Sequence, residues 1–279
     1  MRGSPDAESL QRQVDLALEE DLGSGDLTAG LIDADARSRV EVVCREPAVL
    51  CGTAWFEAVF RRLDRTAAIE WTASDGDRLE PGQVICRMQG NTRALLSGER
   101  TALNYLQTLS GTATLARSYA DAVAGTGVRI LDTRKTLPGL RLQQKYAVSC
   151  GGCANHRIGL YDAILIKENH IHAAGSVRAA LQAAADSAGS GIEIEIEVES
   201  LAQLEEALAA GARRVLLDNF DRPQLRQAVA LNAGRARLEA SGNVNLETVR
   251  AIAETGVDDI SVGGLTKDVK AVDLSMRFV

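Results

Sequence analysis

The sequence predicts an α/β protein that consists of an N-terminal α/β sandwich domain and a (β/α) barrel. Two observations lead to this fold class. After residue 113, short apolar segments alternate with stretches whose apolar residues recur at three- and four-residue spacing, which is typical of strands followed by helices. Each apolar segment ends in polar residues, as the strands of catalytic barrels do. Because strand–helix alternation with short loops builds parallel sheets, we expect six or seven βα units.

The first part of the chain lacks this repeat and is expected to fold separately. The turn residues Asp75, Gly76 and Asp77 separate predicted strands, with a hairpin over 77–88. In chain order, a helix is expected over 11–21, strands over 39–44 and 49–51, a helix over 55–63, and strands over 68–71 and 83–88. A further helix over 98–114 should connect this domain, residues 1–112, to the barrel.

The barrel is expected to occupy residues 113–270. Its strands are predicted over 128–131, 163–166, 192–198, 214–217, 237–240 and 259–262. A doubly wound open sheet would place its ligand at a single switch point. Polar residues follow every predicted strand here, which favours a barrel whose site is built from many strand ends.

Composition excludes several classes of protein. The net charge is −7 and the isoelectric point about 5.2, whereas nucleic-acid binders carry an extended basic face. No segment has the ~18 consecutive apolar residues of a membrane helix, and residues 1–20 lack the apolar core of a secretory signal. The five cysteines are an odd number, which argues against a disulfide framework. We therefore expect a cytoplasmic protein that binds neither nucleic acid nor membrane.

Cations concentrate in one central segment. Between Arg129 and Lys167 there are seven Lys or Arg residues and two acids, a balance of +5, so the rest of the chain carries −12. This segment contains a glycine-rich loop followed by His156 and Arg157. Glycine lets backbone approach a ligand closely, and arginine can bind a carboxylate with two hydrogen bonds. The segment predicts a pocket for a small polyanion.

Carboxylates are expected on the other side of the pocket. Residues 192–199 alternate strictly between β-branched residues and glutamate, so one face of this strand is entirely acidic. In a barrel that face points into the lumen; on an edge strand it would be solvated. Glu197 and Asp218 end neighbouring strands, where carboxylates commonly hold Mg²⁺ or bond ribose hydroxyls.

Two Ser–Gly loops end the last predicted strands. Residues 240–243 and 261–264 each combine serine with glycine, and loops at this position frequently bind phosphate through backbone N–H groups. Cys150 and Cys153 form a CxxC pair. Because the sequence has no second such pair at zinc-finger spacing, we interpret these cysteines as small loop residues.

These motifs together resemble the quinolinate phosphoribosyltransferase family. The matching segments span nearly the whole chain in order: 20–28, 99–104, 109–111, 132–141, 155–162, 166–170, 195–201, 217–219, 241–242 and 262–263. The resemblance implies an incomplete barrel, a C-terminal segment 271–279 that returns to the sandwich, and a homodimer in which each sandwich covers the partner's barrel mouth. The glycine loop departs from the family pattern by containing Cys150 and Cys153.

The resemblance also implies roles for individual residues. Arg134, His156, Arg157 and Lys167 would bind quinolinate, with Arg100 supplied by the other subunit, and Lys135 would lie near both substrates. Glu197 and Asp218 would hold the ribose hydroxyls and the Mg²⁺ of phosphoribosyl pyrophosphate. Lys135, Lys167, Glu197 and Asp218 would be the catalytic residues. The remaining substrate-binding positions would be Thr133, Ser241, Gly242, Asn243, Val262, Gly263 and Gly264, with the serine and the glycines around the 5′-phosphate.

Three other functions compete with this one. Lys167 at a strand end could be the nucleophile of a Schiff-base aldolase, which needs a neutral amine. A relative encoded in molybdate-transport operons shares much of the pattern and uses a different acceptor. A non-catalytic binder of pyridine carboxylates is a third alternative, although it would not need Glu197 and Asp218 beside the phosphate loops.

Overall fold

The computed structural model describes residues 6–279, and the chain divides into two compact units. The N-terminal unit comprises the described residues up to Arg117 together with Leu142–Gly152 and Asp268–Val279. The C-terminal unit comprises Ser118–Arg141 and Cys153–Lys267. Residues 142–152, which we expected within the barrel domain, therefore pack with the N-terminal unit.

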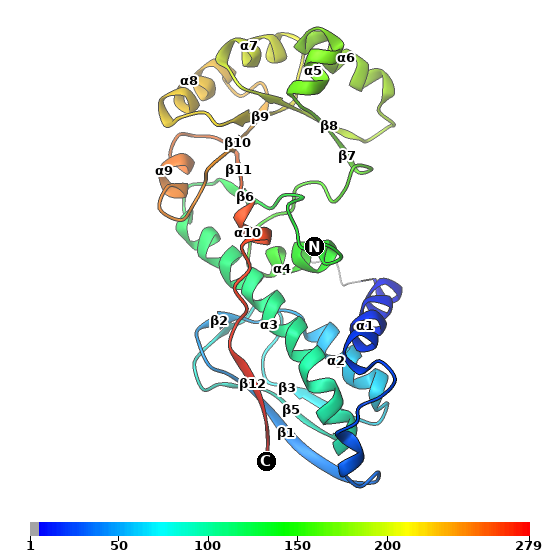
Figure 1. Cartoon of the computed structure of the whole chain (residues 1–279). Coiled ribbons are helices and arrows are strands. Elements are labelled where there is room, and N and C mark those ends of the chain that lie inside the picture. The colour runs from blue at the N-terminus through cyan, green and yellow to red at the C-terminus, as the bar shows by residue number, and fades with distance from the viewer. Residues whose placement is uncertain (1–5) are drawn as a thin grey trace. The chain divides into compact units, whose positions relative to one another are not determined.

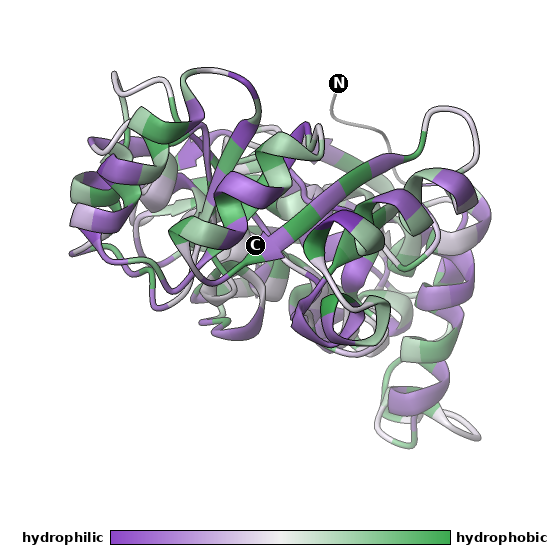
Figure 2. Ribbon diagram, turned by 90° about the horizontal axis from the view of Figure 1, so that it is seen from above, coloured by the Kyte–Doolittle hydropathy of each residue, from purple (hydrophilic) through white to green (hydrophobic). Residues whose placement is uncertain are grey.

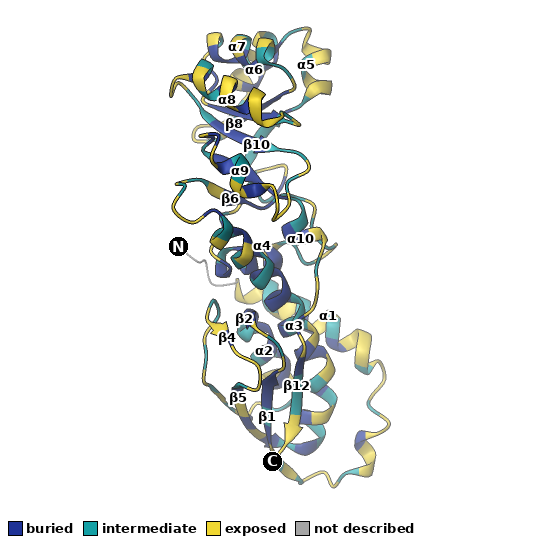
Figure 3. Ribbon diagram, turned by 90° about the vertical axis from the view of Figure 1, so that its left-hand side faces the viewer, coloured by how far each residue is buried: buried dark blue, intermediate teal, exposed yellow. Residues whose placement is uncertain are grey.

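The N-terminal unit contains a four-stranded antiparallel sheet with the order β12-β1-β5-β3. Its strands are β12 (Leu274–Phe278), β1 (Arg37–Cys44), β5 (Val84–Asn91) and β3 (Ala68–Trp71). The apolar sides of α1 (Ala7–Leu22), α2 (Thr53–Leu63) and α3 (Thr92–Ala122) contribute to the same core. Figure 3 shows this core as the buried parts of β1 and α3, whereas much of α1 is exposed. This is the α/β sandwich that the sequence predicts.

Two details of this unit differ from the predictions. The hairpin expected over 77–88 does not form, because β4 (Arg78–Leu79) pairs with β2 (Ala48–Val49), while β5 pairs with β1 and β3. The connecting helix α3 is longer than expected. It starts directly after β5, where the Asn91 side chain accepts a hydrogen bond from the backbone N–H of Ala94 and so caps the helix.

The C-terminal unit is an open barrel of six parallel strands in the order β6-β11-β10-β9-β8-β7. These strands are β6 (Arg129–Leu131), β7 (Ala163–Ile166), β8 (Glu193–Val198), β9 (Arg214–Asp218), β10 (Arg237–Ser241) and β11 (Asp259–Ser261). All six were predicted to within one residue at each end. The edge strands β6 and β7 do not pair with each other, so the barrel is incomplete.

Helices follow the barrel strands. They are α5 (Glu168–Ala174), α6 (Val177–Ser187), α7 (Leu201–Ala209), α8 (Arg222–Asn232), α9 (Val249–Ala253) and α10 (Gly264–Lys267). Figure 1 shows α6, α7 and α8 over one face of β8 and β9, which leaves the opposite face for the lumen. Figure 2 shows hydrophilic and hydrophobic residues alternating along the helical ribbons, as expected for helices with one buried side.

Helix α4 (Arg141–Cys150) was not among the predicted helices. It buries the polar side chains of Gln143, Gln144 and Lys145, so its sequence lacks a clear apolar stripe.

Over residues 6–279, no helix is long and apolar enough to cross a membrane.

Candidate active site

The carboxyl ends of the parallel strands bring polar side chains to one edge of the C-terminal unit. Glu197 on β8 is in register with Leu216 on β9, and Asp218 on β9 is in register with Ser241 on β10. Residues in register on parallel strands face the same side, and so do residues two apart on one strand. Glu197, Asp218 and Ser241 therefore share the lumen face near the carboxyl edge of the sheet.

An ion pair joins two of the predicted catalytic residues. Lys167 follows β7 directly, and its Nζ lies 2.8 Å from Oε2 of Glu197. The Glu197 side chain is one-tenth exposed, whereas that of Lys167 is almost half exposed. Asp218 is not part of this pair, since its Oδ2 accepts a hydrogen bond from Asn219 Nδ2 at 2.8 Å. The acidic strand face is thus neutralised in part by a lysine from the neighbouring strand.

A buried aspartate positions the loop that carries His156 and Arg157. Asp132 follows β6 and is fully buried. Its carboxylate accepts hydrogen bonds from Asn155 Nδ2 at 2.7 Å and from the backbone N–H of His156 at 2.9 Å. Asp132 and Asn155 were not among the predicted site residues. The signal available in the sequence was an aspartate at the end of an apolar strand.

Both ring nitrogens of His156 are engaged within the chain. Nδ1 accepts a hydrogen bond from the backbone N–H of Arg157 at 2.8 Å, and Nε2 lies 2.8 Å from Oε2 of Glu195. An accepting Nδ1 carries no proton, so this geometry selects the neutral ring with its proton on Nε2. We expected His156 to bond a carboxylate or a ring nitrogen of the substrate. The imidazole links the backbone of Arg157 to Glu195 on β8.

The Glu195 side chain belongs to a buried network of charges. Arg214 Nε donates to Oε1 of Glu195 at 2.9 Å, and Arg214 Nη2 donates to Oε2 of Glu239 at 2.7 Å. Glu239 is fully buried and its Oε2 lies 3.6 Å from Nε2 of His156. Burial, followed by the charge of Glu195, raises the pKa of Glu239 to about 7. The alternating glutamates predicted Glu195 in the lumen, but nothing in the sequence pointed to Glu239 or Arg214.

The network acts on His156 in opposing ways. Burial disfavours the charged imidazolium, but the hydrogen bond to Glu195 and the charge of Glu239 outweigh it and raise the pKa of His156. Protonation would, however, cost the hydrogen bond that Nδ1 accepts from Arg157, so the backbone geometry opposes this shift. The hydrogen bond to Nδ1 joins adjacent residues, and as long as it is kept the imidazole is neutral.

Arg134 and Arg157 form the cationic part of the site. Burial and then the charge of Arg134 lower the pKa of Arg157. Within the described part of the chain, the buried Nε of Arg134 has no hydrogen-bond partner. Two neighbouring guanidinium groups, one of them with an unsatisfied buried donor, favour the binding of an anion.

The ends of β6 and β11 meet around Lys135. A Cβ atom added to Gly263 would lie 3.1 Å from Cδ of Lys135 and 3.8 Å from Oγ1 of Thr133, so glycine leaves room for both side chains. The hydroxyl of Thr266 donates to the backbone carbonyl of Lys135 at 2.8 Å. The predicted residues Thr133, Lys135, Val262, Gly263 and Gly264 are therefore close together.

The end of β10 requires its glycine. Gly242 has φ = +104°, a conformation that residues with a side chain rarely adopt, and a Cβ there would collide with the side chain of Asn219. Asn243 follows with φ = +51°, and the backbone N–H of Asn219 donates to the carbonyl of Ser241 at 2.9 Å. The loop after β10 is thereby held against the loop after β9, which carries Asp218.

Several cations of the central segment do not join this site. Arg129 lies at the opposite end of β6 and pairs with Asp259 at 2.8 Å. Arg141 holds the surrounding loops through Thr136 and the carbonyls of Arg134 and Ile158, and Lys145 is buried in the N-terminal unit. Arg100 is exposed on α3 in the N-terminal unit.

Comparison with known proteins identifies the family. The C-terminal domain of quinolinate phosphoribosyl transferase matches residues 112–277, and the N-terminal domain of the same family matches residues 26–110. A probable nicotinate-nucleotide pyrophosphorylase [carboxylating] from Bacillus subtilis (strain 168) is 43% identical over 92% of this chain and 89% of its own length.

Relatives from plants and solved bacterial structures agree. The quinolinate phosphoribosyltransferase [decarboxylating] 2a, mitochondrial, of Nicotiana tabacum is 40% identical over 96% of this chain and 82% of its own. The nicotinate-nucleotide pyrophosphorylase of Francisella tularensis superposes with a TM-score of 0.93 at 42% identity, covering 99% of this chain and 98% of its own. NadC from Streptococcus pyogenes gives 0.96 at 39% identity, covering 99% of both chains. The chain belongs to the quinolinate phosphoribosyltransferase family.

Proposed function

We propose that this enzyme transfers the phosphoribosyl group of phosphoribosyl pyrophosphate to quinolinate and decarboxylates the product, which gives nicotinate mononucleotide, pyrophosphate and CO₂. This is a pentosyl transfer that supplies NAD biosynthesis. The structural observation that carries the proposal is the half-buried guanidinium of Arg134, whose buried Nε has no hydrogen-bond partner among the described residues, beside Arg157. Together with Lys167 they offer the cations that a dicarboxylate requires.

Quinolinate would bind at the end of the barrel that carries Arg134, Arg157 and Lys167. Arginine can bind each carboxylate through paired hydrogen bonds. Asp132 and His156 would fix the loop that carries Arg157, so they act as positioning residues for the bound acid. Lys135, beside Thr133 and Gly263, would lie toward the second substrate.

Phosphoribosyl pyrophosphate would bind along the ends of β8 to β11. Glu197 and Asp218 share one face and present carboxylate oxygens, which suit both ribose hydroxyls and Mg²⁺. When bound, Mg²⁺ would neutralise charge on the leaving pyrophosphate. The loops at Ser241, Gly242 and Asn243 and at Val262, Gly263 and Gly264 would surround the 5′-phosphate, where glycine allows close approach of backbone N–H groups.

The reaction needs little covalent help from the protein. The pyridine nitrogen attacks C1 of the ribose as pyrophosphate leaves, through a transition state with positive charge on the sugar. Positioning and fixed charges supply most of the catalysis of such a step. The pyridinium nitrogen then stabilises the carbanion that remains when the adjacent carboxylate leaves as CO₂.

We further propose that the active form is a cytoplasmic homodimer in which Arg100 reaches the partner's site. Arg100 is exposed on α3 in the N-terminal unit, whereas the other predicted residues all belong to the C-terminal unit. Within residues 6–279, none of the five cysteines is in a disulfide, which suits a reducing compartment.

One assay tests the reaction against its alternatives. Purified protein incubated with quinolinate, phosphoribosyl pyrophosphate and Mg²⁺ should release CO₂ and form nicotinate mononucleotide. A panel of other aromatic acids separates it from the molybdate-operon relative, and absence of turnover with every acceptor would favour a binding protein. Borohydride trapping with a carbonyl substrate tests the aldolase alternative, in which Lys167 would form a Schiff base.

A further inference from the structure

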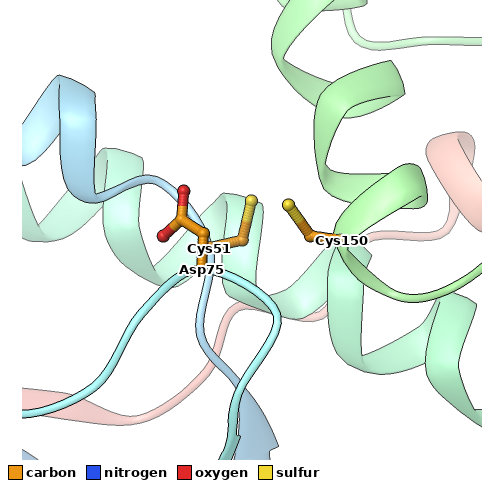
Figure 4. Close-up of side chains that lie close together, drawn as sticks. All are labelled: Cys51, Asp75 and Cys150. Atoms are coloured by element: carbon orange, nitrogen blue, oxygen red, sulfur yellow. The ribbon is translucent and has the colours of Figure 1, made fainter. Parts of the chain in front are cut away.

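Two cysteines and an aspartate meet in the N-terminal unit. Cys51, Asp75 and Cys150 each offer a ligand atom, and these three atoms lie within 4.8 Å of one another. Figure 4 shows the sulfur atoms of Cys51 and Cys150 pointing toward each other, with the Asp75 carboxylate close by. The three residues come from the segment before α2, from the turn after β3 and from the end of α4. The CxxC spacing pairs Cys150 with Cys153, whereas the fold places Cys150 beside Cys51 and Asp75.

The cluster combines buried sulfur with a reachable carboxylate. Both cysteines are fully buried, whereas Asp75 is partly exposed in its turn. A metal ion could enter along the Asp75 side, which satisfies the need for a path into the site. Both cysteines belong to the hydrophobic core of this unit, together with Trp55 and Leu109.

The orientation of Asp75 is set by neighbouring groups. Its Oδ1 accepts hydrogen bonds from the backbone N–H groups of Gly52 and Thr53 at 3.1 and 3.2 Å, and its Oδ2 accepts one from the hydroxyl of Tyr146 at 2.9 Å. Ligating carboxylates in metal sites are typically held by such outer hydrogen bonds.

We propose that Cys51, Cys150 and Asp75 form a binding site for a thiophilic divalent cation of the Zn²⁺ class. Zinc bonds sulfur at about 2.3 Å and carboxylate oxygen at about 2.0–2.2 Å in a tetrahedral arrangement. These lengths imply ligand separations below 4.8 Å, so the side chains need to move little. Both thiols lose a proton as they bind, so one Zn²⁺ enters and two H⁺ leave per chain. Water would complete the fourth position.

Bound metal would link three distant segments of the N-terminal unit. It would join the start of α2, the turn at Asp75 and the C-terminal end of α4. Since such a site exists only in the folded chain, metal binding should stabilise the protein against unfolding. The proposal is independent of the proposed reaction, and its test does not use activity.

Co²⁺ binding to metal-free, reduced wild-type protein tests the proposal, because thiolate ligands give Co²⁺ an intense near-ultraviolet charge-transfer absorption that oxygen ligands do not. With Mg²⁺ in excess to fill carboxylate sites, we expect this absorption to saturate at one Co²⁺ per chain. It should disappear in Cys51→Ser and in Cys150→Ser. It should persist in Cys86→Ser, which alters another buried cysteine of the unit, and in Cys153→Ser, which removes the CxxC alternative. Tyr146→Phe should weaken binding about 10- to 100-fold.

Wild-type protein alone provides a second test, which does not depend on the folding of the variants. Zn²⁺ should release two protons per chain, protect two thiols from alkylation and raise the melting temperature. Absence of the cobalt absorption in wild type, or its persistence in Cys51→Ser, would overturn the proposal. A disulfide between Cys51 and Cys150 in protein that takes up no metal would also overturn it and would define a redox pair.

Discussion

The ammonium group of Lys167 lies 2.8 Å from the carboxylate of Glu197 across the ends of β7 and β8. The cation proposed for quinolinate and the acid proposed for the ribose and Mg²⁺ are thus partners in the ligand-free protein. Binding of either substrate must share or replace this contact. The pair couples the two halves of the site.

Glu197→Gln should affect quinolinate binding and the rate of the reaction differently. The substitution keeps the shape of the side chain and removes the charge that holds Lys167. Quinolinate alone should then bind as well as before or more tightly, while the loss of a transition-state contact should lower kcat by about 10²- to 10³-fold. Calorimetric titration of quinolinate and steady-state kinetics measure the two effects. Weaker quinolinate binding would show that Glu197 is needed to orient Lys167.

Asp218→Asn should act on the second substrate only. Asp218 accepts a hydrogen bond from Asn219 and is not the partner of Lys167, so the charge change should leave quinolinate binding and the melting temperature unchanged. The dependence on phosphoribosyl pyrophosphate and Mg²⁺ should weaken, with a rate loss of about 10²- to 10³-fold. A lower melting temperature with equal weakening of both substrates would assign Asp218 to lumen structure.

Quinolinate should be strongly preferred to nicotinate. Arg134, Arg157 and Lys167 suit two carboxylates, and nicotinate would leave part of this charge unpaired in a partly buried pocket. An unmet buried polar group costs at least ~1–3 kcal/mol, so discrimination in kcat/KM should exceed tenfold. Comparable kcat/KM for the two acids would contradict the proposed pocket.

Much of the fold follows from local patterns in the sequence. The six barrel strands are short apolar segments, and their ends gave the positions of Lys167, Glu197 and Asp218. Helix α4 was missed because its buried Gln143, Gln144 and Lys145 give it no apolar stripe. The length of α3 was underestimated because β5 passes directly into α3, so that the capping residue Asn91 is also the last residue of a strand.

The buried charges could not be predicted because they depend on partners far along the chain. Arg214, Glu239 and Glu195 are ordinary charged residues of three separate strands until register places them on one lumen face. Cys51 and Cys150 are likewise brought together by the packing of α4 in the N-terminal unit. Sequence spacing reports neighbours on one element, not contacts across the fold.

Arg100 should act in the partner subunit's site. Arg100→Ala and Lys167→Ala proteins should each be nearly inactive. When mixed under conditions that exchange subunits, they should recover up to about a quarter of wild-type activity, because half of the dimers are hybrids with one intact site in two. Native mass spectrometry of differently tagged chains is the control for exchange. Exchange without recovery would place Arg100 outside the partner's site.

The stability of Glu239→Gln, measured relative to wild type at the same pH, should increase as the pH rises. The pKa of Glu239 is about 7 in the folded protein against an ordinary value of 4.5, so the folded state binds this proton more tightly than the unfolded chain. Its contribution to the free energy of unfolding is therefore greatest below about pH 4.5 and is lost as the pH rises through about 7. Glutamine retains an acceptor for Arg214 and cannot ionise.

The melting temperature of the variant minus that of wild type should increase between pH 5 and pH 8, by at least the ~2–4 °C that corresponds to 1 kcal/mol in a chain of this size. A constant difference for Glu239→Gln would mean that Arg214 keeps Glu239 ionised throughout, and the network would then consist of permanent charges.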